Sequence, residues 1–129
     1  MAGSKYLLDT NIIAAILNKE PEIEAKIADK EVYLCSIALG ELYYGAFKST
    51  HVEENRRRIE LLATRYPLLL CDQGTAQQYG EIKFALRKKG RPIPENDIWI
   101  AAIGLQHGLT LLSRDDHFTE VENLVIENW

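Results

Sequence analysis

The 129-residue sequence lacks several features that would place it in a common class of protein. No apolar run approaches the roughly 20 residues that a bilayer-spanning helix needs, so we expect no membrane association. The N-terminus lacks the basic and apolar regions of a signal peptide, and residues 1–4 could be a cloning remnant. There is no internal repeat, low-complexity tract or linker. We therefore expect one domain over residues 1–129, because this length suits a single core.

The sequence is also poor in residues that form nucleophilic or zinc sites. Its two cysteines, Cys35 and Cys71, each end a short apolar run and have no cysteine or histidine at zinc-ligand spacing. We expect both to be buried, reduced thiols of a cytoplasmic protein. No serine or cysteine pairs with a histidine as a nucleophile, and no glycine-rich phosphate loop is present. The three histidines look isolated: His51, His107 and His117.

An excess of positive charge is missing as well, because the formal net charge is −4. Bulk charge therefore does not recruit nucleic acid. The cations are nevertheless clustered in residues 56–58 and 87–91. Either run alone is more typical of a solvated helix face, but basic ridges beside an acidic site could hold a polyanion locally.

Short apolar runs alternate with helical patterns along the whole chain. This alternation predicts βαβ units and an α/β fold, a three-layer α/β/α sandwich with a mainly parallel sheet of four to five strands. The helix over 37–47, with Ser36 as its N-cap, is apolar on most sides, so we expect it to be largely buried. Strands are predicted at residues 5–8, 31–35, 68–71, 109–112 and 124–126, and helices at 12–17, 21–30, 37–47, 52–66, 72–89 and 95–107, the last with Gly108 as its C-cap.

Four acidic residues lie near the ends of predicted strands or the starts of predicted helices. Asp9 ends the first strand, and Glu41 lies early in the apolar helix that follows the second. Asp97 falls in the first helical turn after Pro94, and Asp115 follows the fourth strand. Because the carboxyl ends of parallel strands meet at one edge of a sheet, we expect the four carboxylates to converge there. For Asp9 alone, a helix-capping role would be the simpler interpretation.

Converging carboxylates need a compensating charge. Two of them about 4 Å apart repel by roughly 4 kcal/mol at an effective dielectric constant near 20, so a cluster must take up protons or hold cations. Carboxylate oxygens suit Mg²⁺ or Mn²⁺. Such ions commonly serve phosphoryl chemistry, by clamping the phosphate and activating water.

Five short motifs occur in order along nearly the whole chain. They are Leu7-Leu8-Asp9-Thr10-Asn11, then Ser36-x4-Glu41-Leu42 with Gly45, Asn96-Asp97-Ile98-Trp99-Ile100-Ala101-Ala102, Leu111-Leu112-Ser113-Arg114-Asp115-x2-Phe118, and the closing stretch from Asn123-Leu124 to Asn128-Trp129. Each motif is weak alone. In this order they resemble the PIN-domain family, and within it the VapC-type ribonuclease toxins of prokaryotic toxin–antitoxin pairs.

The resemblance implies a metal-dependent endoribonuclease that hydrolyses RNA phosphodiester bonds with Mg²⁺ or Mn²⁺. It implies that Asp9, Glu41, Asp97 and Asp115 are catalytic metal ligands. Asn11 and Ser113 would support them by hydrogen bonding. Asp116 departs from the family pattern, and the spacing to Phe118 favours Asp115 as the site residue. The candidates for holding RNA are Arg87, Lys88, Lys89, Arg91 and Arg114.

The resemblance further implies a VapB-like antitoxin as partner and a homodimer. Tyr43, Tyr44 and Phe47 could supply apolar contacts for either, with core packing as the alternative. The RNA target stays open among transfer, ribosomal and messenger RNA.

Three other functions share parts of this pattern. A haloacid-dehalogenase-like phosphatase needs a second aspartate two residues after the first, where this chain has Asn11. A phosphoacceptor receiver domain needs adjacent acids near the first strand and a late lysine after a strand, and neither is found. A non-catalytic metal- or RNA-binding module remains an alternative, although a metal-free one leaves Glu41 without a role in an apolar setting.

Overall fold

A five-stranded parallel sheet forms the centre of the computed structural model, which describes residues 5–129. The strand order is β3–β2–β1–β4–β5, and each neighbouring pair is parallel. The predicted sheet is therefore confirmed, whereas the suggested cloning remnant, residues 1–4, lies outside the described residues. The strands are β1 (Lys5–Leu8), β2 (Glu31–Cys35), β3 (Leu68–Leu69), β4 (Thr110–Leu112) and β5 (Ile126–Glu127).

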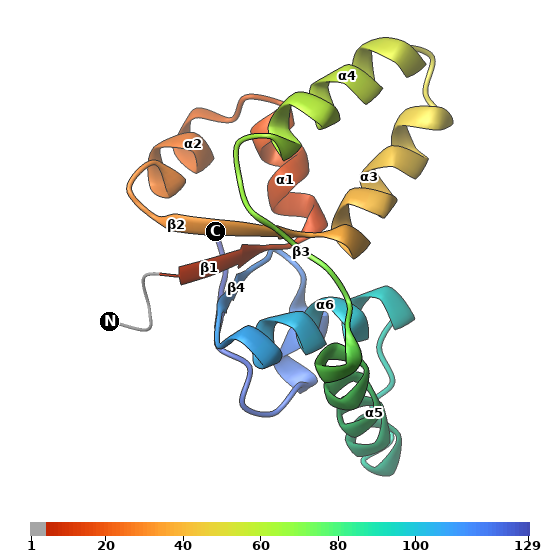
Figure 1. Cartoon of the computed structure of the whole chain (residues 1–129). Coiled ribbons are helices and arrows are strands. Elements are labelled where there is room, and N and C mark those ends of the chain that lie inside the picture. Colours follow the sequence, from red (N-terminus) through yellow and green to blue (C-terminus); the bar gives the residue numbers. More distant parts are fainter. Residues whose placement is uncertain (1–4) are drawn as a thin grey trace.

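Helices cover both faces of this sheet, as Figure 1 shows. The chain first moves from β1 outward to β3, then returns to β4 on the other side of β1. Right-handed crossovers in these opposite directions place the two sets of helices on opposite faces. The expected three-layer sandwich results. One layer holds α1 (Thr10–Leu17), α2 (Pro21–Ile27), α3 (Ser36–Phe47) and α4 (Val52–Ala63), and the other holds α5 (Gln73–Lys88) and α6 (Glu95–His107).

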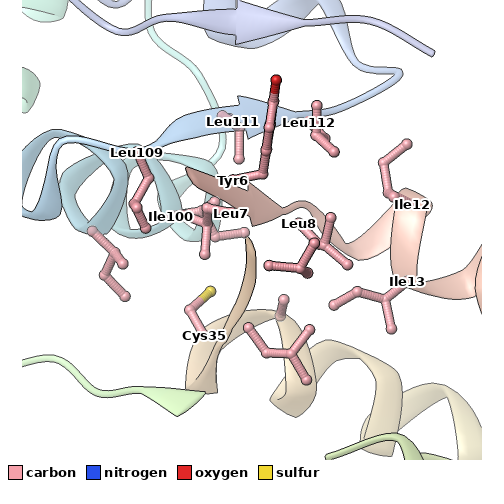
Figure 2. Packing of buried hydrophobic residues seen from close by; sticks show 14 of the residues in the cluster. Tyr6, Leu7, Leu8, Ile12, Ile13, Cys35, Ile100, Leu109, Leu111 and Leu112 are labelled. Atoms are coloured by element: carbon pink, nitrogen blue, oxygen red, sulfur yellow. The ribbon is translucent and has the colours of Figure 1, made fainter. Parts of the chain in front are cut away.

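The core lies on both faces of β1 and β4. Leu7, Leu8, Leu111 and Leu112 are fully buried, because a parallel sheet covered on both sides exposes neither face to water. Figure 2 shows these side chains packed among residues from the adjoining helices, including Ile12, Ile13 and Ile100. The rigid centre of the molecule therefore ends directly at the residues that follow β1 and β4.

Two helix ends follow from local chemistry. Asp72 caps α5 through a capping box, in which its side chain accepts from the Thr75 backbone while the Thr75 side chain accepts from the Asp72 backbone. Gly108 ends α6 with φ of +64°, a left-handed conformation that glycine adopts without penalty. The predicted C-cap is thus confirmed.

Several sequence predictions need correction. Helix α3 buries only Ala38, Leu39 and Ala46, because it lies in the outer layer and leaves one side open to water. Ser36 is the first residue of α3 and not its N-cap. Strand β3 has two residues, since it is an edge strand that pairs only with β2, and Cys71 beyond it is exposed. Helix α4 ends at Ala63, and β5 begins at Ile126.

Within residues 5–129, no helix combines the length and the apolar character that crossing a bilayer would require.

Candidate active site

Asp9 and Ser113 lie side by side because β1 and β4 are paired in register. Leu8 is the partner of Leu112, so the next residue on each strand also lies opposite its neighbour. The Ser113 hydroxyl donates to Asp9 Oδ2 at 2.6 Å, and the Thr10 backbone N–H donates to Asp9 Oδ1 at 2.8 Å. Both residues are buried. Asp9 is therefore a fixed carboxylate with both oxygens hydrogen-bonded, one of them to Ser113.

Glu41 reaches the same edge from the middle of α3. The Thr10 hydroxyl donates to Glu41 Oε1 at 2.5 Å, and the Asn96 amide donates to Oε2 at 3.3 Å. Thr10 begins α1 directly after Asp9, and Asn96 is the second residue of α6. Glu41 is only half-buried, which corrects the expectation of an apolar setting. Its carboxylate is nevertheless held between the beginnings of two helices.

Asp97 and Asp115 lie close together, and His117 lies beside both. Asp97 is the third residue of α6. Asp115 caps the 3₁₀ helix η2 (Asp116–Glu120) by accepting from the His117 backbone N–H at 2.9 Å. The His117 Nδ1 atom is 3.1 Å from Asp97 Oδ2 and 3.1 Å from Asp115 Oδ1. His117 was expected to be isolated, and the structure corrects this.

Two of the acids, Asp9 and Asp97, have raised pKa values. Burial raises the pKa of Asp9 above its ordinary value, and the negative charges of Asp97 and Glu41 raise it further. The hydrogen bonds from Ser113 and Thr10 lower this pKa and offset part of the increase. Burial also raises the pKa of Asp97, with Asp115 and Glu41 adding to it and the hydrogen bond to His117 opposing it. The negative charge of Asp97 thus links Asp9 to the other acids. Within residues 5–129, the group whose donor atoms lie within 4.8 Å of one another holds Asp97 and Asp115 with His117, and Asp9 and Glu41 lie outside it.

Asn11 and Arg114 hold the loop after β4. The Arg114 backbone N–H donates to Asn11 Oδ1 at 3.2 Å, which ties this loop to the start of α1. The Arg114 guanidinium pairs with Glu20 at 2.8 Å and donates to the Trp129 carbonyl at 3.2 Å. Asp116 is exposed, whereas Asp115 faces Asp97. Asn11 thus fixes the loop that leads to Asp115, and Asp115, not Asp116, belongs to the group with Asp97.

The basic run over residues 87–91 forms the last turn of α5 and the start of the loop that leads to α6. Glu95 pairs with Lys83 at 3.1 Å, and the Trp99 ring stacks on Tyr79 with centroids 4.0 Å apart, so α6 begins against the middle of α5. The last turn of α5 continues away from the sheet (Figure 1). The run therefore lies to one side of the acidic site. Its member Lys89 is paired with Glu120 at 3.6 Å.

Comparison with known proteins identifies the family to which this chain belongs. The family model of the PIN domain matches residues 6–124, nearly the whole chain. The chain belongs to the PIN-domain family.

Similar proteins match this PIN domain over nearly its whole length. A ribonuclease VapC2 of Haemophilus influenzae is 40% identical, over 97% of this chain and 98% of that protein. A tRNA(fMet)-specific endonuclease VapC of Shigella flexneri is 34% identical over the same shares. The crystal structure of DNA-bound VapBC from Salmonella typhimurium matches with a TM-score of 0.91 and 32% identity, over 97% of this chain and 98% of that one. The α/β fold is thus the one found in these relatives.

Sequence reasoning missed three polar residues of the PIN-domain site. Thr10 and Asn96 lie within the sequence motifs, and their positions at helix starts next to Asp9 and Asp97 were the available signal. His117 carried a weaker signal, since it is the second residue after an aspartate that precedes a turn. Its contact with Asp97 spans 20 residues of sequence and could not be inferred from spacing.

Proposed function

We propose that this protein is a metal-dependent endoribonuclease that acts as the toxin of a toxin–antitoxin pair. The close placement of Asp97 and Asp115 carries the proposal, in a chain whose relatives are named VapC ribonucleases. The electrostatic influence of Asp97 and Glu41 on the buried Asp9 supports it. RNA in the cytoplasm is the proposed substrate. Because the S. flexneri relative is named for tRNA(fMet), that RNA is the first to test.

The donor atoms fit a hard divalent cation. Asp9, Glu41, Asp97 and Asp115 offer oxygen ligands, and their mutual repulsion is the condition that a cation relieves. We propose that these four residues hold Mg²⁺ or Mn²⁺. Such an ion, when bound, supplies positive charge to the scissile phosphate and makes a bound water more acidic.

The remaining residues keep the carboxylates in place. Ser113 and the Thr10 backbone fix the orientation of Asp9, so its carboxylate does not rotate away from the site. Thr10 and Asn96 do the same for Glu41. Asn11 holds the loop that carries Asp115. Because the carboxylates are already ordered, little further conformational entropy is lost when the reaction begins.

The test is an RNA cleavage assay with Mg²⁺ or Mn²⁺, with EDTA, and with a generic phosphatase substrate. Asp9→Asn or Asp97→Asn should lower cleavage by about a hundredfold or more, on the scale of losing one electrostatic interaction with the transition state. Asp116→Asn is the matched control, since Asp116 is exposed, and it should keep most of the activity. Near wild-type cleavage by either site variant would contradict the assignment, and hydrolysis of the phosphatase substrate alone would favour the phosphatase alternative.

We also propose a VapB-like antitoxin partner and a homodimer. The solved relatives include the VapBC complexes of S. typhimurium and Rickettsia felis. Tyr44 and Phe47 on α3 are 67% and 61% exposed, so core packing does not explain them, whereas Tyr43 packs partly against the core. Tyr44→Ser with Phe47→Ser should weaken dimerisation or antitoxin binding in sedimentation experiments. Unchanged association in both would exclude this surface.

A further inference from the structure

His117 places an imidazole nitrogen beside two of the proposed metal ligands. Its Nδ1 atom is 3.1 Å from an oxygen of Asp97 and 3.1 Å from an oxygen of Asp115. One donor atom from each of these three residues lies within 4.8 Å of the other two. This spacing matches that of ligands around a single ion, whose bonds to nitrogen and oxygen are about 2.0–2.2 Å long.

The fold holds the imidazole in this position. Its backbone N–H donates to Asp115 Oδ1 at 2.9 Å, so His117 and Asp115 are fixed relative to each other at the start of η2. The next residue, Phe118, is fully buried and anchors that turn in the core. The His117 side chain is 49% exposed, against 14% for Asp97, so the imidazole lies on the solvent side of the carboxylates.

We propose that His117 is a ligand of the metal ion and gives this site a preference for first-row transition ions, with Mn²⁺ as the probe, over Mg²⁺. The inference rests on the proposed metal site and deepens it. Mg²⁺ is bound mainly by oxygen and demands near-ideal octahedral geometry. Imidazole nitrogen suits first-row transition ions better, so a mixed nitrogen and oxygen set shifts selectivity toward them.

The alternative is that His117 is a positively charged partner of the two acids and occupies the place of an ion. The two roles have opposite consequences. A ligand increases metal affinity, so its removal weakens binding. A competing cation decreases metal affinity, so its removal strengthens binding of every divalent ion.

The experiment measures Mn²⁺ binding by electron paramagnetic resonance, with Mg²⁺ affinity obtained by competition. Wild-type protein is compared with His117→Gln and with the control His107→Gln, in the last turn of α6 at the opposite end from Asp97. His117→Gln should weaken Mn²⁺ binding about tenfold or more, since even groups that only support metal ligands often contribute that much. Mg²⁺ binding should change much less, and His107→Gln should match wild type.

Pulsed resonance on the Mn²⁺-loaded proteins provides a direct reading. A coordinated imidazole gives a ¹⁴N modulation, which should be present in wild type and in His107→Gln and lost in His117→Gln. Equal or tighter binding of both ions by His117→Gln, or tight Mn²⁺ binding by wild type without the nitrogen signal, would overturn the role of His117 alone. A wild-type protein that binds neither ion would overturn the proposed metal site as well. Circular dichroism should show that all three proteins are equally folded.

Discussion

At the scale of single residues, Asp9 shows how the fold prepares a buried charge. It is 4% exposed, yet its carboxylate accepts from the Ser113 hydroxyl and from the Thr10 backbone. These bonds lower the pKa of Asp9, while burial and the neighbouring acids raise it, and burial has the largest effect. The site therefore depends on a hydrogen bond between residues at the ends of two adjacent strands.

Ser113→Ala removes that hydroxyl. We expect the free energy of unfolding to fall by about 1–3 kcal/mol, because a buried carboxylate loses a donor. Urea unfolding measures this, and Thr64→Ala is the control, since the hydroxyl of the exposed Thr64, directly after α4, donates to the Leu61 carbonyl in the last turn of that helix. The control should change stability by less than about 0.5 kcal/mol. Equal losses in both variants would show that the Ser113 hydroxyl has no special role.

The two thiols should differ in reactivity. Cys35 is fully buried, and burial raises the pKa of its thiol to about 11, so little reactive thiolate forms at neutral pH. Cys71 is exposed, although partial burial and Asp72 raise its pKa somewhat. An aromatic disulfide reagent should therefore modify one thiol in the native protein and two in denaturant. Cys71→Ser should abolish the native reaction, and a remaining native reaction would contradict the buried position of Cys35.

At the scale of elements, a cluster of polar residues at the start of α5 and the end of α6 joins these two helices. Asp72 Oδ1 accepts from the Gln106 amide at 2.7 Å and from the Thr75 backbone at 3.1 Å. Gly74 lets Gln106 approach, since a Cβ there would lie 2.7 Å from its Nε2 atom. The cluster thus caps α5 and joins it to α6 far along the sequence.

Asp72→Ala should lower the melting temperature by about 3–6 °C at pH 7, because α5 loses its cap. The Gln106 and Thr75 hydrogen bonds lower the pKa of Asp72 below its unfolded value. A lowered carboxyl pKa stabilises the fold above the unfolded pKa, near 4, and this contribution is lost as the pH falls through the folded value. The difference between wild type and variant should therefore narrow in acid. A constant difference down to pH 2 would contradict the charge contribution.

The end of α5 should contribute to RNA binding through charge. No ion pair within residues 5–129 engages Arg87, Lys88 or Arg91. Replacing all three by Gln should weaken RNA binding and reduce the salt slope by about 0.7 for each phosphate that is no longer neutralised, because fewer counterions are released. The measurement is binding of RNA over a range of salt to proteins that also carry Asp97→Asn, in which we expect cleavage to be slow.

The control for this prediction removes the same number of cations from the opposite layer, with Lys48, Arg57 and Arg65 replaced by Gln. These side chains are exposed on α4 and at the ends of α3 and α4, across the sheet from α5. The control should keep the wild-type salt slope. Equal salt slopes for the parent protein, this variant and the control would show that the run at 87–91 is a solvated helix end with no part in RNA binding.

At the scale of the whole molecule, the acidic site should destabilise the metal-free fold. Asp97→Asn keeps the size of the side chain and removes one negative charge from the cluster. In EDTA we expect the variant to melt higher than wild type, because less repulsion remains. With excess Mg²⁺ or Mn²⁺ the difference in melting temperature between the two proteins should narrow or reverse, since only wild type gains the full binding energy of the ion.

Paired melting curves with chelator and with metal provide the measurement. The matched control is Asp116→Asn, which removes the same charge at an exposed position two residues from Phe118. It should show the metal-induced shift of wild type. Equal shifts for wild type and Asp97→Asn would exclude Asp97 as a ligand.

The sequence alone determined the order of elements, the parallel sheet and the four acids that approach its edge. These follow from local rules: apolar runs form strands, and caps such as Gly108 end helices. In parallel βαβ units, the residues after each strand meet at one edge. Asp9 could be placed at the end of β1 because strand and helix patterns meet at that residue.

Only the tertiary structure decided how the side chains meet. His117 contacts Asp97, and Thr10 and Asn96 donate to Glu41. Each of these contacts joins segments that are far apart in the sequence. Exposure was decided in the same way: Cys71 and one side of α3 lie open to water, because β3 and the α3 layer form the outer edges of the molecule. The pattern of apolar residues in the sequence indicates which segments are apolar, but the burial of a segment depends on which other segment covers it.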